Sequence, residues 1–532
     1  MTGRRERDVE GLLLIAVLGV TVVVGTIVGG RYRVAPPVLL IALGALIGLL
    51  PPFDRVSLPP DVVLVLFLPA ILYRESLVIS LREIRDNFAA ITLLAVLLVL
   101  ITTVAVSFVA QALGVSPTAA WVLGAVLGPT DAAAVAGLAK RMPRGILTTL
   151  RAESLVNDGT ALVVFAVAVG VIAGGRTPGP LVLLGQFVAS AGVGIVAGLL
   201  VGLVIIKIRR RIDDSMIEGG LSILTPVVAF LLAELVHGSG VLAVVVAGLL
   251  IAYAAPQVIR ARSRIVALSF WDLFTFMLNG GLFVLLGTQV PRSLKAITSH
   301  GPMASLGIAI AIVAVVVLTR MAWLHLAVGG LQAIDRRASR RARRFDWRTR
   351  TVAGWAGFRG AVSLAAALAV PAATHAGAPV PERDLIIFVT VVVIVLMMLI
   401  QGITLPAVAT WAGLTGDDGT EDEVRQAQVR ATEAALRALP QVAADVGAPQ
   451  DAVDRLSAEY QDHLDGIRTA RDEDTTQQEE LDRQLRLGLI GAKRDEINRL
   501  RKAKEIDDTV LRQVQSALDV EEVRLLGLRI EE

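Results

Sequence analysis

Five polar side chains, those of Glu153, Ser154, Asn157, Asp158 and Thr160, lie close together in an otherwise apolar stretch of the chain, Ala152–Phe165 (AESLVNDGTALVVF). Glu153 and Asn157 are four residues apart, and so are Ser154 and Asp158, so each pair stacks on one face of a helix. A charged side chain in mid-bilayer costs roughly 3 to more than 10 kcal/mol, and such residues therefore usually mark an ion or proton path. An oxygen-rich face with a central carboxylate suits a small cation or a proton. The alternative role is polar contact between helices.

The composition places this stretch in a membrane domain. Of 532 residues 54% are hydrophobic, the mean hydropathy is +0.67, and the charged residues are concentrated beyond about residue 413. We expect a transmembrane domain at 1–413 and a helical cytoplasmic tail at 414–532, with Pro440 and Pro449 as helix breakers. We predict that the tail is regulatory. Cysteine is absent, which excludes disulfides and thiolate sites.

The membrane domain contains thirteen apolar stretches, each long enough to cross a bilayer when tilt is allowed. Lysine and arginine are concentrated in alternate connections, such as Lys207–Arg211 and the arginine-rich 333–350. The positive-inside pattern predicts an outside N-terminus and a cytoplasmic C-terminus, with the basic loops touching membrane lipid rather than nucleic acid. The predicted spans are 11–29, 36–51, 60–78, 88–113, 117–139, 147–173, 180–206, 216–237, 239–255, 266–290, 302–330, 351–372 and 384–413.

Two of the predicted spans are interrupted. Gly128 and Pro129 lie in the middle of the fifth span, directly before Thr130 and Asp131, and the twelfth span carries glycines around Arg359. A pair of interrupted spans, one in each half, points to a transporter built from inverted repeats, in which two broken helices cross at the midplane. Asp131 would then offset exposed helix N-termini and Arg359 exposed C-termini. The alternative is that the glycines serve only close helix packing.

Five segments resemble the monovalent cation:proton antiporter family, the sodium/proton exchangers of the bacterial electroneutral type. The resemblance implies thirteen spans divided into a dimerisation domain and a mobile core domain, and exchange of a monovalent cation for H⁺. Sodium is the first candidate, with K⁺ and Li⁺ as alternatives. The segments occur in the family's order: Phe67–Leu77 (FLPAILYRESL), Gly128–Leu138 (GPTDAAAVAGL), Glu153–Ala161 (ESLVNDGTA), Phe270–Gly287 (FWDLFTFMLNGGLFVLLG) and Gly357–Ala367 (GFRGAVSLAAA).

The resemblance also assigns the ligands of the transported ion. By position, Asp158 matches the carboxylate that binds the cation and carries the proton. Ser154 matches a side-chain ligand, and Thr130 matches a ligand that acts through its backbone carbonyl. Asn157 stands where the electrogenic branch has a second aspartate. Glu75 matches an acidic residue of the third span.

Further expectations from the resemblance concern charge pairing and cellular context. Glu153 and Arg359 match a buried ion pair that joins two core helices, and Asp131 belongs to the crossing of the broken helices. Arg74 separates Glu75 from the preceding aromatic residue, which departs from the family pattern. We expect a homodimer in the plasma (bacterial inner) membrane that serves sodium transport and pH homeostasis and uses no cofactor.

The chemistry of a single carboxylate leads to the same mechanism. In a partly dry cavity, desolvation favours the neutral form of Asp158, which can therefore hold either a proton or a dehydrated cation. Competition for one site couples the cation flux to the proton flux if the site crosses the membrane only while a cation or a proton neutralises the carboxylate. Because Asn157 is neutral, one proton per monovalent cation is expected, hence electroneutral exchange. The alternative is a cation channel, which needs a continuous pore. No pairing of residues indicates an enzyme.

Overall fold

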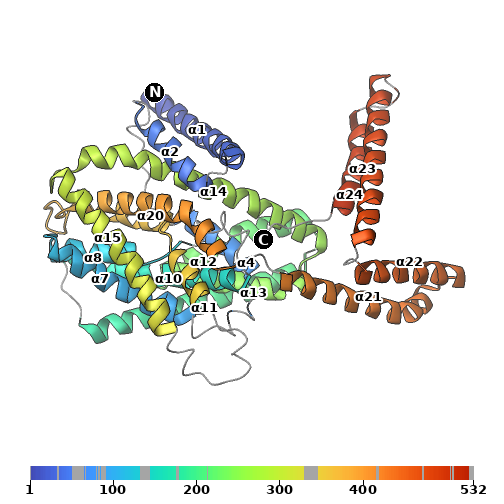
Figure 1. The fold of residues 1–532 in the computed structure, drawn as a ribbon, viewed down its shortest axis with the longest axis horizontal. Helices are drawn as coiled ribbons and strands as arrows, with labels where there is room; N and C mark the ends of the chain where they lie inside the picture. Colours follow the sequence, from blue (N-terminus) through green and yellow to red (C-terminus); the bar gives the residue numbers. More distant parts are fainter. Residues whose placement is uncertain are drawn as a thin grey trace. The chain divides into compact units, whose positions relative to one another are not determined.

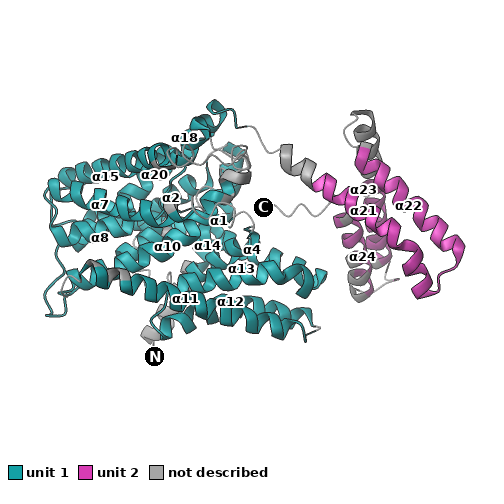
Figure 2. Cartoon of the chain, turned by 90° about the horizontal axis from the view of Figure 1, so that it is seen from below, with its two compact units in different colours: residues 1–416 teal, residues 417–532 magenta. Residues whose placement is uncertain are grey.

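The chain is all α-helical apart from short π-helical turns and one isolated bridge, within the part that the structure describes, so the predicted class is confirmed there. This computed structural model divides into two compact units, residues 1–416 and 417–532 (Figure 2). It describes residues 2–32, 35–50, 67–79, 91–131, 144–174, 179–212, 214–328, 346–414, 418–469, 473–503 and 508–526, with the single residues 65, 81, 84 and 505.

Nine helices in the described ranges are long and apolar enough to cross a membrane (Figure 1). Two of them adjoin a π-helix, η3 (Leu93–Leu97) before α7 and η5 (Leu324–Val328) after α15. The nine are α1 (Thr2–Tyr32), α7 (Leu98–Ala112), α10 (Arg144–Ile172), α11 (Pro180–Arg209), α12 (Ser215–Leu235), α13 (Gly240–Val258), α14 (Ala261–Ala296), α15 (Pro302–Trp323) and α20 (Arg383–Trp411).

Shorter helices occupy the remaining predicted spans. Five predicted spans lie partly outside the described residues, so the number thirteen stays a prediction; they are 36–51, 60–78, 88–113, 117–139 and 302–330. The twelfth predicted span is two short helices with a non-helical segment between them, as its glycines indicated. The shorter helices are α2 (Pro36–Gly48), α4 (Leu68–Val78), α8 (Pro117–Leu127), α18 (Trp347–Trp355) and α19 (Ala361–Ala369).

The helices of the first unit pack into two groups. One consists of α1, α2, α4 and α11–α14, and the other of α7, α8, α10, α15 and α18–α20. Trp271 and Ala247 are fully buried in an apolar core of the first group, and Leu127 and Phe388 in one of the second. A third core joins the two groups, with Val284 of α14 and Val391 of α20 fully buried in it. Between α2 and α14 the backbones touch, because a Cβ atom on Gly44 would overlap the carbonyl oxygen of Val284.

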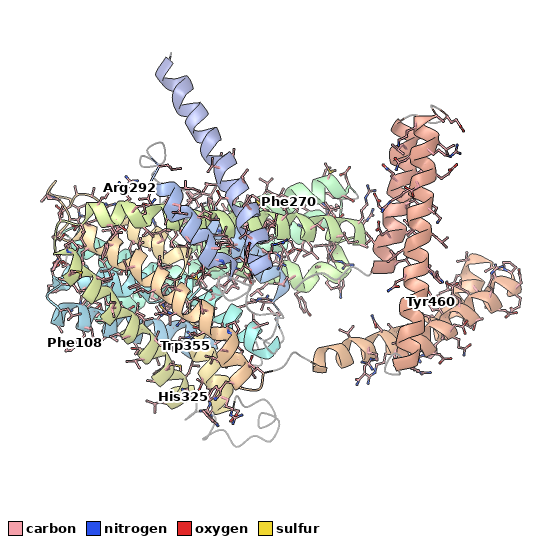
Figure 3. The ribbon with its side chains drawn as sticks, turned by 45° about the horizontal axis from the view of Figure 1, so that its top comes forward. Phe108, Phe270, Arg292, His325, Trp355 and Tyr460 are labelled. Atoms are coloured by element: carbon pink, nitrogen blue, oxygen red, sulfur yellow. The ribbon has the colours of Figure 1, made fainter. Side chains whose placement is uncertain are left out.

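Large apolar side chains also cover the outside of this unit. Phe108 on α7 is 75% exposed (Figure 3). Leu181 on α11 and Leu318 on α15 are exposed in the same way. An apolar outer surface of this extent is what lipid contact requires and is rare on soluble proteins.

The second unit contains two pairs of consecutive helices. These are α21 (Asp418–Val446) with α22 (Gln450–Thr469), and α23 (Glu473–Lys502) with α24 (Asp508–Leu526). The prediction that Pro440 breaks a helix is wrong, because Pro440 lies inside α21. A proline removes only one backbone donor, and α21 continues to Val446, where Gly447 with φ of 69° ends it.

Candidate ion-binding site

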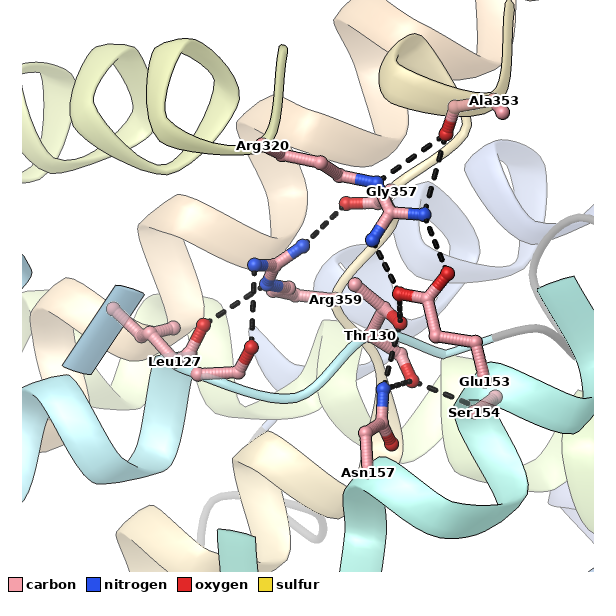
Figure 4. A network of polar contacts seen from close by, with 10 residues as sticks. Leu127, Thr130, Glu153, Ser154, Asn157, Arg320, Ala353, Gly357 and Arg359 are labelled. Carbon is pink, nitrogen blue, oxygen red and sulfur yellow. Dashed lines mark hydrogen bonds and ion pairs between the residues drawn. The ribbon is translucent and has the colours of Figure 1, made fainter. Parts of the chain in front are cut away.

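Helix α10 carries all five polar residues of the opening stretch into the interior, including Thr160. Glu153, Asn157 and Asp158 are 1%, 1% and 5% exposed, and Ser154 is also buried. The preceding helix α8 ends at Leu127, and the chain then runs non-helically through residues 128–131. This segment lies against α10, so the two motifs that the sequence separates meet in one place (Figure 4).

Thr130 is the centre of the polar contacts. The Ser154 hydroxyl donates to the Thr130 carbonyl oxygen (3.0 Å), and the Asn157 amide donates to the Thr130 hydroxyl (2.8 Å) and carbonyl (3.4 Å). The Thr130 hydroxyl in turn donates to Glu153 Oε1 (3.0 Å). One side of α10 therefore fixes the Thr130 carbonyl within the non-helical segment that follows α8.

The segment after α8 also meets the break between α18 and α19. The main-chain N–H of Asp131 donates to the carbonyl oxygen of Phe358 (2.9 Å), which lies between α18 and α19. The Asp131 carboxylate lies at the first turn of α19, because a Cβ atom on Gly360 would overlap its Oδ2 atom. Gly360 is the N-cap residue of α19, so the negative charge lies at the positive end of that helix.

The ion pair predicted between Glu153 and Arg359 is wrong. Glu153 is bonded at both carboxylate oxygens by Arg320 of α15, with 2.9 Å between Nη2 and Oε2. Both side chains are 1% exposed. Arg320 also donates to the carbonyl oxygen of Ala353 (3.3 and 3.2 Å), which joins α15 to α18. A planar guanidinium makes this two-point contact only when it approaches the carboxylate in its plane, and Arg320 does so.

Arg359 has another set of partners. Its Nε atom donates to the carbonyl oxygen of Leu127 (2.9 Å), and its Nη2 atom donates to that of Gly128 (3.4 Å). Its Nη1 atom donates to the carbonyl oxygen of Gly357 (2.6 Å) in its own break. The positive charge therefore lies at the C-terminal end of α8, where carbonyl groups have no helical partner.

Asp158 faces a small cavity beside this network. The cavity has a volume of about 40 Å³, which holds more than one water molecule. Asp158 is without a hydrogen bond or ion pair to any residue that the structure describes. Polar groups from four elements line the cavity together with apolar side chains; they belong to Glu75, Asp131, Arg151, Ser154, Asp158 and Asn279.

Glu75 lies in the cavity wall next to a positive charge. Its Oε2 atom is 3.7 Å from Nε of Arg151 on α10, at ion-pair distance but without a hydrogen bond. The intervening Arg74 turns away and donates from Nε to Oδ1 of Asp272 on α14 (2.7 Å). The structure thus adds Arg151 and Arg320 to the residues that sequence reasoning identified. Only Arg320 had a signal in the sequence, as a lone charge inside an apolar span.

A buried carboxylate that faces a cavity where the end of α8 meets the break between α18 and α19, inside a membrane-embedded helical unit, is the arrangement of a cation-coupled secondary transporter. The profile of the family "Sodium/hydrogen exchanger, transmembrane" matches residues 18–411. The chain belongs to this family, whose members exchange Na⁺ and H⁺ across membranes.

Three similar proteins illustrate the relationship. An uncharacterized Na⁺/H⁺ exchanger of Mycobacterium tuberculosis is 50% identical over 538 aligned positions, covering 99% of each chain. The low-affinity Na⁺/H⁺ antiporter NhaS1 of Synechocystis is 32% identical, covering 68% of this chain and 67% of that protein. The solved sodium/proton antiporter MjNhaP1 of Methanocaldococcus jannaschii shares the fold with a TM-score of 0.58 and 22% identity, covering 75% of this chain and 99% of that one.

Proposed function

We propose that this protein exchanges one monovalent cation, sodium first, for one proton by competition at Asp158. The observation that carries the proposal is the isolation of this carboxylate. Asp158 is 5% exposed, faces the cavity and has no ion-pair partner among the described residues. A buried unpaired charge is costly, so the group is stable only when it holds a proton or a cation.

The proposed ligands of the cation surround Asp158. Ser154 and the Thr130 carbonyl are already in contact through a hydrogen bond of 3.0 Å. When a cation enters, the Ser154 hydroxyl would turn its hydrogen away and offer a lone pair, while the carbonyl oxygen needs no change. Asn157 would hold Thr130 in place through its amide, and Glu75 would act from the cavity wall. Such hard oxygen ligands suit alkali cations.

The charges of the neighbouring residues support electroneutral exchange. Glu153 is matched by Arg320, and Glu75 lies 3.7 Å from Arg151, so their charges are already offset. Asn157 is neutral in either state. Asp158 then remains as the group that changes its occupant, one proton for one monovalent cation. The site would cross the membrane in either neutral state and not when Asp158 is empty and charged.

Alternating access would come from the two groups of helices. The group containing α8, α10 and α19 carries the site, and the group containing α11–α14 would be the scaffold and the homodimer interface. We place the N-terminus outside and the C-terminus in the cytoplasm of the bacterial inner membrane, from the arginine distribution. Ser116 and His300 both contact Glu382, so three connections assigned to the outside lie on one side, as this topology requires. Residues 417–532 would be the regulatory tail.

The test is exchange by purified protein in proteoliposomes across pH, with Na⁺, K⁺ and Li⁺ supplied singly. We expect Asp158→Asn and Asp158→Ala to abolish exchange without loss of folded protein, and Asp346→Asn, a surface helix cap on α18, to retain it. A voltage-sensitive dye should report no potential during exchange by the unaltered protein. Cation-for-proton exchange by Asp158→Ala vesicles would refute the single-carboxylate mechanism, and a potential that develops during exchange would refute electroneutrality.

A further inference from the structure

The first residues of α20 contact α8 and α19, each at the end that lies away from Thr130 and Arg359. These two ends, the N-terminal end of α8 and the C-terminal end of α19, are called the outer ends below. Glu382 is the N-cap residue of α20, and Arg383 is its first residue. Neither belongs to the ion-binding network around Thr130. Their side chains diverge, and each reaches the end of a different half-helix, α8 in one case and α19 in the other.

Glu382 binds the N-terminal end of α8. Its Oε2 atom accepts hydrogen bonds from the main-chain N–H (2.9 Å) and the hydroxyl (2.6 Å) of Ser116, the N-cap residue of α8. Nε2 of His300 lies 3.8 Å from the other oxygen. The backbone of Glu382 is left-handed, with φ of 52° and ψ of 26°. A residue with a side chain rarely adopts this conformation, and such strain is retained where surrounding contacts enforce it.

Arg383 binds the C-terminal end of α19. Its Nε atom donates to the carbonyl oxygen of Val370 (2.7 Å), the C-cap residue of α19. Its Nη2 atom donates to the carbonyl oxygen of Leu368 (3.3 Å) in the last turn. A positive charge thus lies at the end of α19 where carbonyl groups have no helical partner.

Each half-helix therefore has an acidic side chain at its N-terminal end and a basic one at its C-terminal end. For α8 these are Glu382 and Arg359, and for α19 they are Asp131 and Arg383. The inner charges belong to the two breaks, and the outer charges are neighbours on one helix. Because adjacent residues of α20 hold both outer ends, α8 and α19 cannot slide against each other without breaking these contacts.

We propose that Glu382 and Arg383 are positioning residues of the cation site. The inference rests on the function proposed above, with Thr130 as a cation ligand. Thr130 follows the end of α8, so a shift of this rigid helix moves its carbonyl oxygen away from α10. Loss of either outer contact should weaken cation binding and leave the steps after binding unchanged.

The test compares the sodium KM and the maximal exchange rate of three variants. They are Glu382→Gln, Arg383→Gln and the charge-swapped double variant Glu382→Arg with Arg383→Glu. We expect each single variant to raise KM by about two- to fivefold, the factor for about 0.3–1 kcal/mol per helix-end charge, with a maximal rate within about twofold. The charge-swapped double variant keeps the same two side-chain types but places a positive charge at the N-terminal end of α8 and a negative charge at the C-terminal end of α19. Both placements are unfavourable, so we expect this variant to raise KM further.

Asp384→Asn is the matched control, because Asp384 lies in the same turn but accepts its hydrogen bonds from Thr298 and Ser299 in the α14–α15 connection. It should change thermal stability and leave KM unchanged. An unchanged KM in both single variants, or an equal rise in Asp384→Asn, would overturn the positioning role.

A second measurement separates this inference from the proposed function. Sodium that binds the folded protein raises Tm, and the sodium concentration at half-maximal effect reports affinity without transport. We expect this midpoint to shift by the same factor as KM in Glu382→Gln and Arg383→Gln. If the unaltered protein does not exchange sodium for protons, the proposed function is wrong. If the sodium midpoints of these variants do not shift, the positioning role is wrong.

Discussion

Removal of Arg320 should destabilise the protein through the charge that it leaves behind. Glu153 is 1% exposed, and without Arg320 its carboxylate keeps the Thr130 hydroxyl as its remaining donor in the network described. Breaking a buried ion pair by removing one partner costs about 3–5 kcal/mol, because the other charge stays buried and unpaired. We therefore expect Arg320→Gln to lower the free energy of unfolding by about that amount.

A double-mutant cycle separates this pairing from the one that sequence reasoning predicts. In Glu153→Gln with Arg320→Gln no unpaired charge remains, so the double variant should lose less stability than the two single variants added together. We expect a coupling energy of about 2–3 kcal/mol. The corresponding cycle between Glu153 and Arg359 should give less than about 1 kcal/mol, since Arg359 is bonded to carbonyl groups at the end of α8.

The measurement is unfolding of the purified protein in mixed micelles by increasing SDS, followed by tryptophan fluorescence. Lys295→Gln, an exposed residue near the end of α14, is the control and should leave the transition in place. If Glu153 couples to Arg359 as strongly as to Arg320, or if the double variant Glu153→Gln with Arg320→Gln is as unstable as the sum of its parts, the reasoning is refuted.

Three other substitutions test the close packing of the site and its scaffold. Gly360→Ala should raise the sodium KM, because the added methyl group would displace the Asp131 carboxylate from the start of α19. Asn157→Asp should abolish sodium-dependent stabilisation in Tm measurements rather than create a second proton site, because it replaces the donor to the Thr130 carbonyl by a repelling oxygen. Gly44→Ala should lower Tm without changing KM, because its methyl group would overlap a backbone carbonyl of α14.

The sequence by itself determined the kind of protein and much of its site. Hydropathy identified the membrane-embedded helices, the Gly128–Pro129 pair indicated where α8 ends, and the glycines around Arg359 indicated where the twelfth predicted span is interrupted. The four-residue spacing on α10 placed the polar groups on shared faces. These inferences succeed because helix periodicity and helix breaking depend on residues near one another in the chain.

Only the tertiary structure decided which charges meet. Two buried arginines were chemically competent to pair with Glu153, and the partner, Arg320, is 167 residues away. The contacts of Arg151 with Glu75 and of Glu382 with Ser116 likewise join separate elements. Ion pairing depends on the distance and orientation of charged groups, which helix packing sets and local sequence does not encode.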